Sequence, residues 1–258
     1  MKKPNLAILL YSCKKNSDMW NIFLQLFKKY WSDCEYPVIL LTDFYDEHSD
    51  TGFDEVITLD SSWRDMVEAG IKKAGTKYVM LFMDDYLLCD YVDNAKIKFF
   101  LEEAEKYNAA NIRLLESPTI KAVSFDKNSS YHYYEPGTAY SFSTQVGIWN
   151  AECLLKYCKK GWSAWDFERK GSVEIRDYKH PLLAPKDYAF PYEEGVRKGK
   201  WMDVGARICK RNNIKLDFSK RKAMSNFELA WIYFKGGILQ LNPTIIVKIQ
   251  NKIQRKKR

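Results

Sequence analysis

The sequence lacks the features that mark secreted, membrane-spanning and zinc-binding proteins. Its six cysteines include no C-x-x-C pair, and no histidine lies at zinc-ligand spacing from them. The N-terminal segment does not resemble a signal peptide, and its apolar run is far shorter than the roughly 20 residues that cross a bilayer. We therefore expect reduced thiols and a cytoplasmic protein.

Signature motifs of two large enzyme classes are missing as well. The Walker pattern G-x-x-x-x-G-K-[ST] does not occur, which excludes a P-loop. Without a G-x-S-x-G elbow, serine hydrolase chemistry is not expected. The three histidines are scattered, so we assign them no metal. There is no internal repeat and no Gly/Ser linker, which predicts a single domain over residues 1–258.

What the sequence does contain is an alternation of short apolar runs and helical segments. Apolar runs predict buried strands at 5–11, 37–42, 55–59 and 77–83, with helices after the first and the third. This order, β-α-β-β-α-β, predicts an α/β fold with a mixed, mainly parallel sheet and helices on both faces. In the second half we predict helices at 94–107, 152–158 and 226–241, and strands at 110–115 and 140–149.

Two adjacent aspartates, Asp84 and Asp85, directly follow the strongest predicted strand. Parallel sheets bind ligands at the carboxyl ends of their strands, so this pair is a candidate site. Carboxylates there would repel a bare diphosphate unless Mg²⁺ or Mn²⁺ lies between them, because these ions take carboxylate, phosphate and water oxygens. On spacing alone, the alternative is that Asp84 caps the next turn and Asp85 is exposed.

The stretch that leads to this pair, WRDM at residues 63–66 and then AGTKYVMLFMDD at 74–85, resembles a segment of GT-A glycosyltransferases. In that family a helix, a short turn and a buried strand deliver an Asp-x-Asp type motif to the donor diphosphate. The resemblance covers about residues 5–201 and is clearer in the first half. It is greatest to the small bacterial enzymes that build capsule, O-antigen and other surface polysaccharides.

The resemblance implies a GT-A, Rossmann-like domain with a nucleotide-sugar-binding half and an acceptor half. The implied divisions are 1–92 for the first, 93–225 for the second, and 226–258 for C-terminal helices and a basic tail. It also implies Mg²⁺ or Mn²⁺ held by Asp84 and Asp85. Tyr86 stands where a strict Asp-x-Asp has its second carboxylate, so either the two aspartates form a shortened motif or only one holds the metal.

A base for an inverting reaction is implied in the second half. Inverting GT-A enzymes place an acidic residue at the start of a helix after the acceptor-side strand, where it accepts the proton of the attacking hydroxyl. The run from Trp165 through Asp166 to Glu168 resembles that position. We predict that Glu168 is the base and that Asp166 is a helix cap or a neighbour of the metal. The alternative is an ordinary cap followed by a surface glutamate.

Further donor contacts are predicted in a glycine-flanked basic stretch at residues 195–201. There Arg197, Lys198 and Lys200 would neutralise the leaving diphosphate, with a solvated basic turn as the alternative. The resemblance also places base and ribose contacts at three positions near strand ends or a helix start. These are Tyr11, Asp43 and Arg64.

Two tryptophans are candidates for binding the acceptor. Trp149 and Trp165 have faces that would stack on sugar rings, with core packing as the alternative for each. The resemblance thus implies a hexosyltransferase type of reaction, in which a saccharide hydroxyl, on a lipid carrier in our expectation, displaces a nucleoside diphosphate with inversion.

The C-terminal end is basic, since no acidic residue follows Glu228 while seven lysines and arginines do. Isoleucines at 245, 249 and 253 and lysines at 248, 252 and 256 would form neighbouring stripes of a helix. This predicts peripheral contact with the inner face of an anionic membrane, with a frayed, solvated tail as the alternative. Nucleic acid is not expected, because no aromatic residues interleave with these charges.

Two other functions stay open. Nucleotidyl transfer also uses an α/β sheet with acidic metal ligands, although the chain has no Gly-rich N-terminal phosphate loop. A non-catalytic carbohydrate-binding or scaffold protein with a transferase-like fold is the third possibility, which the missing carboxylate at Tyr86 permits.

Overall fold

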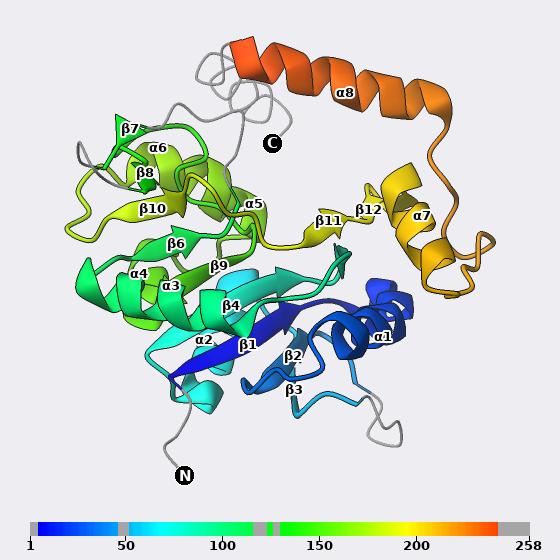
Figure 1. Ribbon diagram of the computed structural model, residues 1–258, viewed down its shortest axis with the longest axis horizontal. Helices are drawn as coiled ribbons and strands as arrows, with labels where there is room; N and C mark the ends of the chain where they lie inside the picture. The colour runs from blue at the N-terminus through cyan, green and yellow to red at the C-terminus, as the bar shows by residue number, and fades with distance from the viewer. Residues whose placement is uncertain (1–4, 46–51, 116–122, 126–129, 242–258) are drawn as a thin grey trace.

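The protein was analysed as a computed structural model, which describes residues 5–45, 52–115, 123–125 and 130–241, the last stretch with some side chains of its final helix left out. These residues form a nine-stranded sheet in the order β3-β2-β1-β4-β9-β6-β10-β8-β7 (Figure 1). The strands are β1 (Leu6–Tyr11), β2 (Val38–Thr42), β3 (Glu55–Thr58), β4 (Tyr78–Met83), β6 (Asn111–Arg113), β7 (Val123–Ser124), β8 (Tyr131–Tyr133), β9 (Gly147–Asn150) and β10 (Leu182–Pro185).

The sheet is mixed, and most of its strands share one direction. The four strands from β3 to β4 are mutually parallel, while β9 is antiparallel to both β4 and β6, and β8 is antiparallel to both β10 and β7. The predicted mixed, mainly parallel α/β sheet is therefore confirmed. Two small two-stranded sheets flank it, formed by β5 (Tyr86–Leu88) with β11 (Tyr192–Glu194) and by β12 (Val196–Arg197) with β13 (Lys200–Trp201).

Helices cover both faces of the sheet, as predicted. Alternating residues of β1 divide between two cores, with Ile8 and Leu10 in one and Leu9 in the other. The first core includes side chains of α1 (Asp18–Tyr30), α3 (Asn94–Lys106) and α7 (Asp203–Arg211). The second includes side chains of α2 (Trp63–Ala74) and α4 (Ala151–Tyr157). The remaining helices are the short η1 (Lys14–Asn16), the run α5 (Ala164–Asp166), η2 (Phe167–Gly171) and α6 (Ser172–Glu174), and α8 (Asn226–Leu241).

Local chemistry explains the well-predicted helix α2. The Ser62 side chain accepts a hydrogen bond from the Asp65 backbone and so caps its N-terminus. Gly75 ends the helix with a left-handed φ of 61°. The helix then leads through a short turn to β4, whose six residues pair in register with β1 from Leu6↔Tyr78 to Tyr11↔Met83. The residues that follow β1 and β4 therefore emerge side by side.

The predicted strand at 140–149 is shorter in the structure. Only Gly147–Asn150 forms β9, and the residues before it form a loop. Tyr140 adopts a left-handed φ of 58°, which is incompatible with an extended strand. The resulting loop carries Ser143 and Thr144 to one wall of the candidate site.

Candidate active site

A cleft of about 880 Å³ lies past the carboxyl end of β4. Four segments that are distant in the sequence form most of its walls, and each includes side chains that can bind a polar ligand. The segments are Met83–Tyr86, the loop Tyr140–Gln145, the helix start Ala164–Glu168 and the stretch Tyr192–Lys198. The cleft thus brings Asp85, Trp165, Glu168, Arg197 and Lys198, five of the predicted site residues, to a common space.

Asp85 lies in this cleft in a strongly negative environment. Burial raises the pKa of its carboxyl to about 8, with further contributions from the neighbouring carboxylates of Asp84 and Glu194. The backbone carbonyl of Asp85 accepts a hydrogen bond of 2.7 Å from Gly195, which fixes the chain next to Glu194. Such a carboxyl gains stability from a proton or from a bound cation.

Asp84 points to a different place. Its Oδ2 accepts a hydrogen bond of 2.6 Å from Ser12 Oγ, and its Oδ1 accepts one of 3.3 Å from Asn16 Nδ2. Burial raises its pKa to about 6 against these hydrogen bonds, which lower it. Asp84 is buried and is not among the residues lining the cleft. It connects the end of β4 to the chain that follows β1.

A cation site made of protein side chains alone is not present in the described residues, which contain no group of three or more His, Cys, Asp or Glu able to hold a metal. Mg²⁺ and Mn²⁺ commonly use one or two carboxylates and complete their shell with phosphate oxygens and water. The crowded carboxyl of Asp85 fits that kind of shared site, with Asp84 adjacent to it in the chain.

Glu168 is held firmly on the opposite side of the cleft. Its Oε1 accepts hydrogen bonds of 2.7 and 2.8 Å from Thr144 N and Oγ1, and one of 3.2 Å from Ser143 Oγ. The π-helical segment η2 carries it, and Ser172 Oγ donates to its backbone carbonyl at 2.6 Å. Glu168 is 9% exposed, so it is not the surface glutamate of the alternative interpretation. Its second oxygen, Oε2, accepts none of these bonds.

Asp166 acts as a helix cap, which is one of its two predicted roles. Its Oδ2 accepts from the Ser163 backbone at 3.3 Å and from Ser163 Oγ at 3.0 Å, forming a capping box. Its Oδ1 lies 2.8 Å from Lys170 Nζ. The cleft lining does not include Asp166, so the structure brings Glu168 and not Asp166 to the site.

The glycine-flanked basic stretch forms a hairpin beside the cleft. Lys198 and Gly199 both have positive φ, 53° and 74°, as the two central residues of a tight primed turn require. Arg197 and Lys198 line the cleft, and Arg197 forms an ion pair with Glu194. Lys200 instead pairs with Glu228 at 2.5 Å and does not line the cleft.

Two glycines let this hairpin approach the aspartates. A Cβ on Gly205 in α7 would lie 2.5 Å from the Gly195 backbone, and a Cβ on Gly195 would lie 2.4 Å from the Leu87 side chain. Neither distance is sterically possible without rearrangement. Because residues 195 and 205 are both glycines, the chain at Gly195 can pack closely against β5 and α7. This packing holds Glu194 and Arg197 near Asp85.

The two predicted acceptor tryptophans have different surroundings. Trp165 lines the cleft and is 65% exposed, with the Arg169 guanidinium 5.8 Å from its ring centroid. Trp149 is fully buried, and its ring packs against Phe142 and Phe167 at centroid distances of 6.2 and 5.5 Å. This corrects the predicted role of Trp149, because a ring without an exposed face cannot stack on a sugar.

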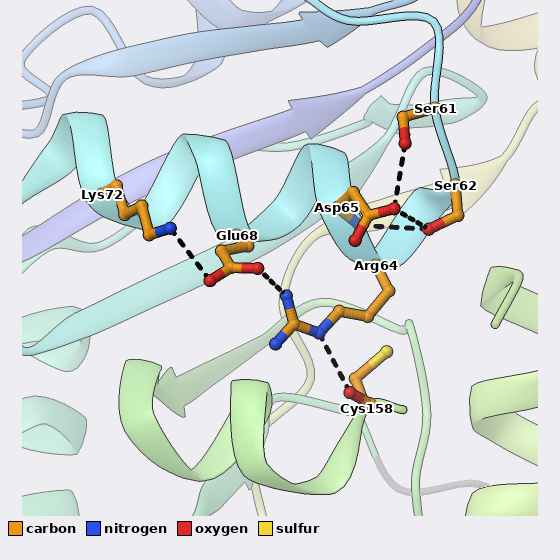
Figure 2. Close-up of polar contacts among 7 residues, drawn as sticks. All are labelled: Ser61, Ser62, Arg64, Asp65, Glu68, Lys72 and Cys158. Atoms are coloured by element: carbon orange, nitrogen blue, oxygen red, sulfur yellow. Dashed lines mark hydrogen bonds and ion pairs between the residues drawn. The ribbon is translucent and has the colours of Figure 1, made fainter. Parts of the chain in front are cut away.

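Arg64 has structural partners, and its predicted contact with the nucleotide remains a prediction. Its Nε donates to the backbone carbonyl of Cys158 at 3.0 Å, and its guanidinium pairs with Glu68 (Figure 2). Figure 2 shows the side chain reaching from the first turn of α2 to the end of α4. Buried and engaged in this way, Arg64 joins two helices and does not line the cleft.

Tyr11 and Asp43 lie at the carboxyl ends of β1 and β2, on the Asp84 side of the site. Asp43 Oδ1 accepts a hydrogen bond of 2.6 Å from the Lys14 backbone. Burial raises the pKa of the Tyr11 hydroxyl, and the nearby Cys13, Asp43 and Asp84 add to the shift. Their predicted contacts with the nucleotide remain predictions.

The sequence analysis missed the residues that support Glu168. Arg113, at the end of β6, is 1% exposed, and its Nη2 donates to the carbonyls of Tyr140 and Ser141 at 2.8 Å each. It thereby holds the loop that carries Ser143 and Thr144. An arginine inside a predicted buried strand, at 110–115, was the available signal.

An aromatic pair at the base of the cleft was missed too. The rings of Tyr86 and Tyr192 lie 4.8 Å apart, and Gln145 is hydrogen-bonded to both hydroxyls. Tyr86 therefore occupies the position of the missing carboxylate with a buried, packed ring.

Comparison with known proteins gives neither a family model nor a curated protein that matches the chain. Among solved structures, it is similar to S. aureus TarS, with 11% identity and a TM-score of 0.48 over 84% of this chain and 41% of that one. It is also similar to a UDP-glucose pyrophosphorylase complexed with UDP-glucose, with 9% identity and a TM-score of 0.47 over 81% of this chain and 98% of that one.

A third similar structure is a cytidylyltransferase from Leptospira borgpetersenii, with 12% identity and a TM-score of 0.40 over 92% of this chain and 97% of that one. The chain spans 60%, 69% and 68% of the TarS 1–349 fragment in three structures of it, and 41% of the longer TarS chain. At these identities and TM-scores, the similar structures do not assign a reaction to this chain. An assignment has to be argued from the side chains of the cleft.

Proposed function

We propose that this protein is a nucleotide-sugar glycosyltransferase that transfers a sugar to a saccharide hydroxyl by inverting single displacement. The observation that carries the proposal is the cleft itself. It places Asp85, at the carboxyl end of a parallel strand, and Glu168, a buried and oriented carboxyl group, on the walls of one space. Ligands of parallel sheets bind at this edge.

The donor side is the part of the cleft around Asp85. Asp85, with Asp84 adjacent, would hold Mg²⁺ or Mn²⁺ against the donor diphosphate. The bound ion would neutralise the negative charge that develops on the leaving nucleoside diphosphate. Arg197 and Lys198 line the same cleft and would bind diphosphate oxygens.

Glu168 would act as the base. The attacking hydroxyl forms a bond to the anomeric carbon while the bond from that carbon to the diphosphate breaks, and the hydroxyl proton passes to Glu168. Because Oε1 is engaged by Ser143 and Thr144, Oε2 is the oxygen left to take the proton. The fixed carboxylate also orients the nucleophile.

Trp165 would bind the acceptor through its exposed ring, since sugar faces stack on aromatic side chains. We further propose a lipid-linked saccharide acceptor at the inner face of a membrane, in synthesis of a bacterial surface polysaccharide. The basic tail that supports this, with its stripes at 245–253 and 248–256, lies outside the described residues. In the part that is described, no helix has both the length and the apolar character needed to cross a membrane.

The test is release of nucleoside diphosphate from a panel of UDP-, GDP- and TDP-sugars, with saccharide acceptors and with or without Mn²⁺. We expect release with at least one donor, and a loss of about 100-fold or more in Asp85→Ala and Glu168→Gln. Glu174→Gln is the matched control, because this glutamate lies in the same helical run as Glu168 but pairs with Lys159 at 2.9 Å outside the cleft.

Other products would overturn the proposal. Release of pyrophosphate or nucleoside monophosphate would favour nucleotidyl transfer. Tight binding of a nucleotide sugar without turnover of any donor would favour a carbohydrate-binding or scaffold protein.

A further inference from the structure

Helix α8 carries an exposed aromatic face. Figure 1 shows this helix, drawn in orange, extending along one side of the molecule away from the central sheet. Phe227, Trp231 and Phe234 are 79%, 48% and 59% exposed. At about 100° per residue, these three positions lie within about 60° of one another around the helix. Trp231 and Phe234 stack at a centroid distance of 5.7 Å, and Phe227 lies on the same side of the helix.

A polar contact anchors the start of the helix. Glu228 Oε2 accepts hydrogen bonds of 2.9 and 3.0 Å from the backbone and side chain of Ser225, and Glu228 Oε1 pairs with Lys200 at 2.5 Å. Glu228 is about 100° around the helix from Phe227. The ion pair therefore attaches the start of α8 to the β12–β13 hairpin. Around the helix, Trp231 lies about 60° and Phe234 about 120° from Glu228, so the aromatic face lies beside this attachment.

The charge of the chain identifies what this patch can bind. Beyond Glu228 the sequence contains seven lysines and arginines and no aspartate or glutamate. Phenylalanine and tryptophan on one face, combined with a surplus of Lys and Arg, is the composition of helices that lie in the interface of an anionic bilayer. A second copy of the chain is a poorer partner, because two such basic segments would repel each other.

We propose that the face formed by Phe227, Trp231 and Phe234 inserts into the surface of a membrane that contains anionic lipid. The rings enter the boundary between headgroups and acyl chains, and the basic residues that follow in the sequence are attracted to the lipid phosphates. The contact is independent of sugar transfer. It would place the membrane next to the cleft, because Arg197 and Lys198 of the same hairpin line the cleft and Lys200 holds α8.

Vesicle co-sedimentation of the full chain tests this proposal without donor or metal present. We expect the protein to bind phosphatidylcholine vesicles containing about 30% phosphatidylglycerol, and to bind pure phosphatidylcholine at least about fivefold more weakly. The triple variant F227S/W231S/F234S should bind the anionic vesicles about tenfold more weakly than the wild type. Phe99→Ser is the matched control, because Phe99 is also 48% exposed but belongs to α3, and it should bind as the wild type does.

Three results would overturn the proposal. In the first, the triple variant binds anionic vesicles as strongly as the wild type does. In the second, the wild type binds neither kind of vesicle. The third is a dimer that sedimentation detects in the wild type but not in the triple variant, together with unchanged vesicle binding, since this would make a second copy the partner. A thermal melt of each variant confirms folding. None of these outcomes bears on nucleoside diphosphate release, so the two proposals fail separately.

Discussion

At the scale of single residues, two of the carboxyl groups lining the cleft, those of Asp85 and Glu168, are held in opposite ways. Three hydrogen bonds converge on Glu168 Oε1, which fixes the orientation of the group. Asp85 is instead buried near the carboxylates of Asp84 and Glu194. Burial and these two negative charges raise the pKa of its carboxyl to about 8. A fixed orientation suits proton transfer, whereas an unfavourable negative charge suits pairing with a cation.

The raised pKa of Asp85 predicts how the metal-free protein responds to pH. A carboxyl with a folded pKa near 8 and an unfolded pKa of about 3.9 binds more protons in the folded state between these values. The free energy of unfolding must then fall as pH rises through that interval. With chelator present, we expect the melting temperature to drop between about pH 5 and about pH 8, and to drop less in Asp85→Asn.

The comparison between variants isolates this group from others that titrate over the same range. Asp90→Asn is the control, because Asp90 is exposed and accepts a hydrogen bond from the backbone of its neighbour Tyr91. An Asp85→Asn protein whose melting temperature depends on pH as steeply as that of the wild type would contradict the assigned environment.

At the scale of elements, the crossing of α7 over Gly195 positions the basic hairpin. We predict that Gly205→Ala destabilises the fold by about 1–3 kcal/mol, because the added methyl must displace backbone. A Cβ at Gly205 would lie 2.5 Å from Gly195. Gly171→Ala is the control, since its Cβ would meet its nearest neighbour at 3.4 Å, an ordinary contact. Urea denaturation measures both, and equal losses would argue against this crossing as a constraint.

The attachment of α2 to α4 gives a second prediction at this scale. Arg64→Met should lower the free energy of unfolding by about 1–3 kcal/mol, because it leaves the Cys158 carbonyl without its donor and Glu68 without its guanidinium. Because Arg64 does not line the cleft, the donor affinity of the variant, measured by calorimetry, should stay within about twofold of the wild-type value. A large loss of affinity with unchanged stability would restore the nucleotide contact that the sequence predicted.

At the scale of the whole molecule, one sheet joins two cores, and the cleft is built from segments of both halves. A ligand that contacts these segments stabilises the folded state by mass action. If the cleft is the donor site, UDP at about 100 times its dissociation constant, with Mn²⁺, should add about 2.7 kcal/mol and raise the melting temperature by about 5–10 °C. Chelator, or the Asp85→Ala substitution, should remove most of this shift. No shift with UDP, GDP or TDP would argue against a nucleotide donor.

The sheet and its helices were largely predictable because their signals are local. Apolar runs marked β1, β2, β3 and β4, and the helices predicted after the first and third runs are α1 and α2. The strand before Gly147 was overestimated, because apolar composition does not reveal the left-handed Tyr140 that turns the chain into a loop. Asp85, Glu168 and Trp165 were identified as site candidates by type and position, and the structure places all three in one cleft.

The sequence by itself determined which side chains are available: adjacent aspartates after a buried strand, an acidic pair after a tryptophan, and a basic end without carboxylates. Only the tertiary structure decided which of each pair faces the cleft. Asp84 and Asp166 are engaged by Ser12 and Ser163, while Asp85 and Glu168 line the cavity. The physical reason is that a side chain's direction depends on strand register, helix phase and the partners supplied by distant segments, none of which is encoded in the spacing of the residues themselves.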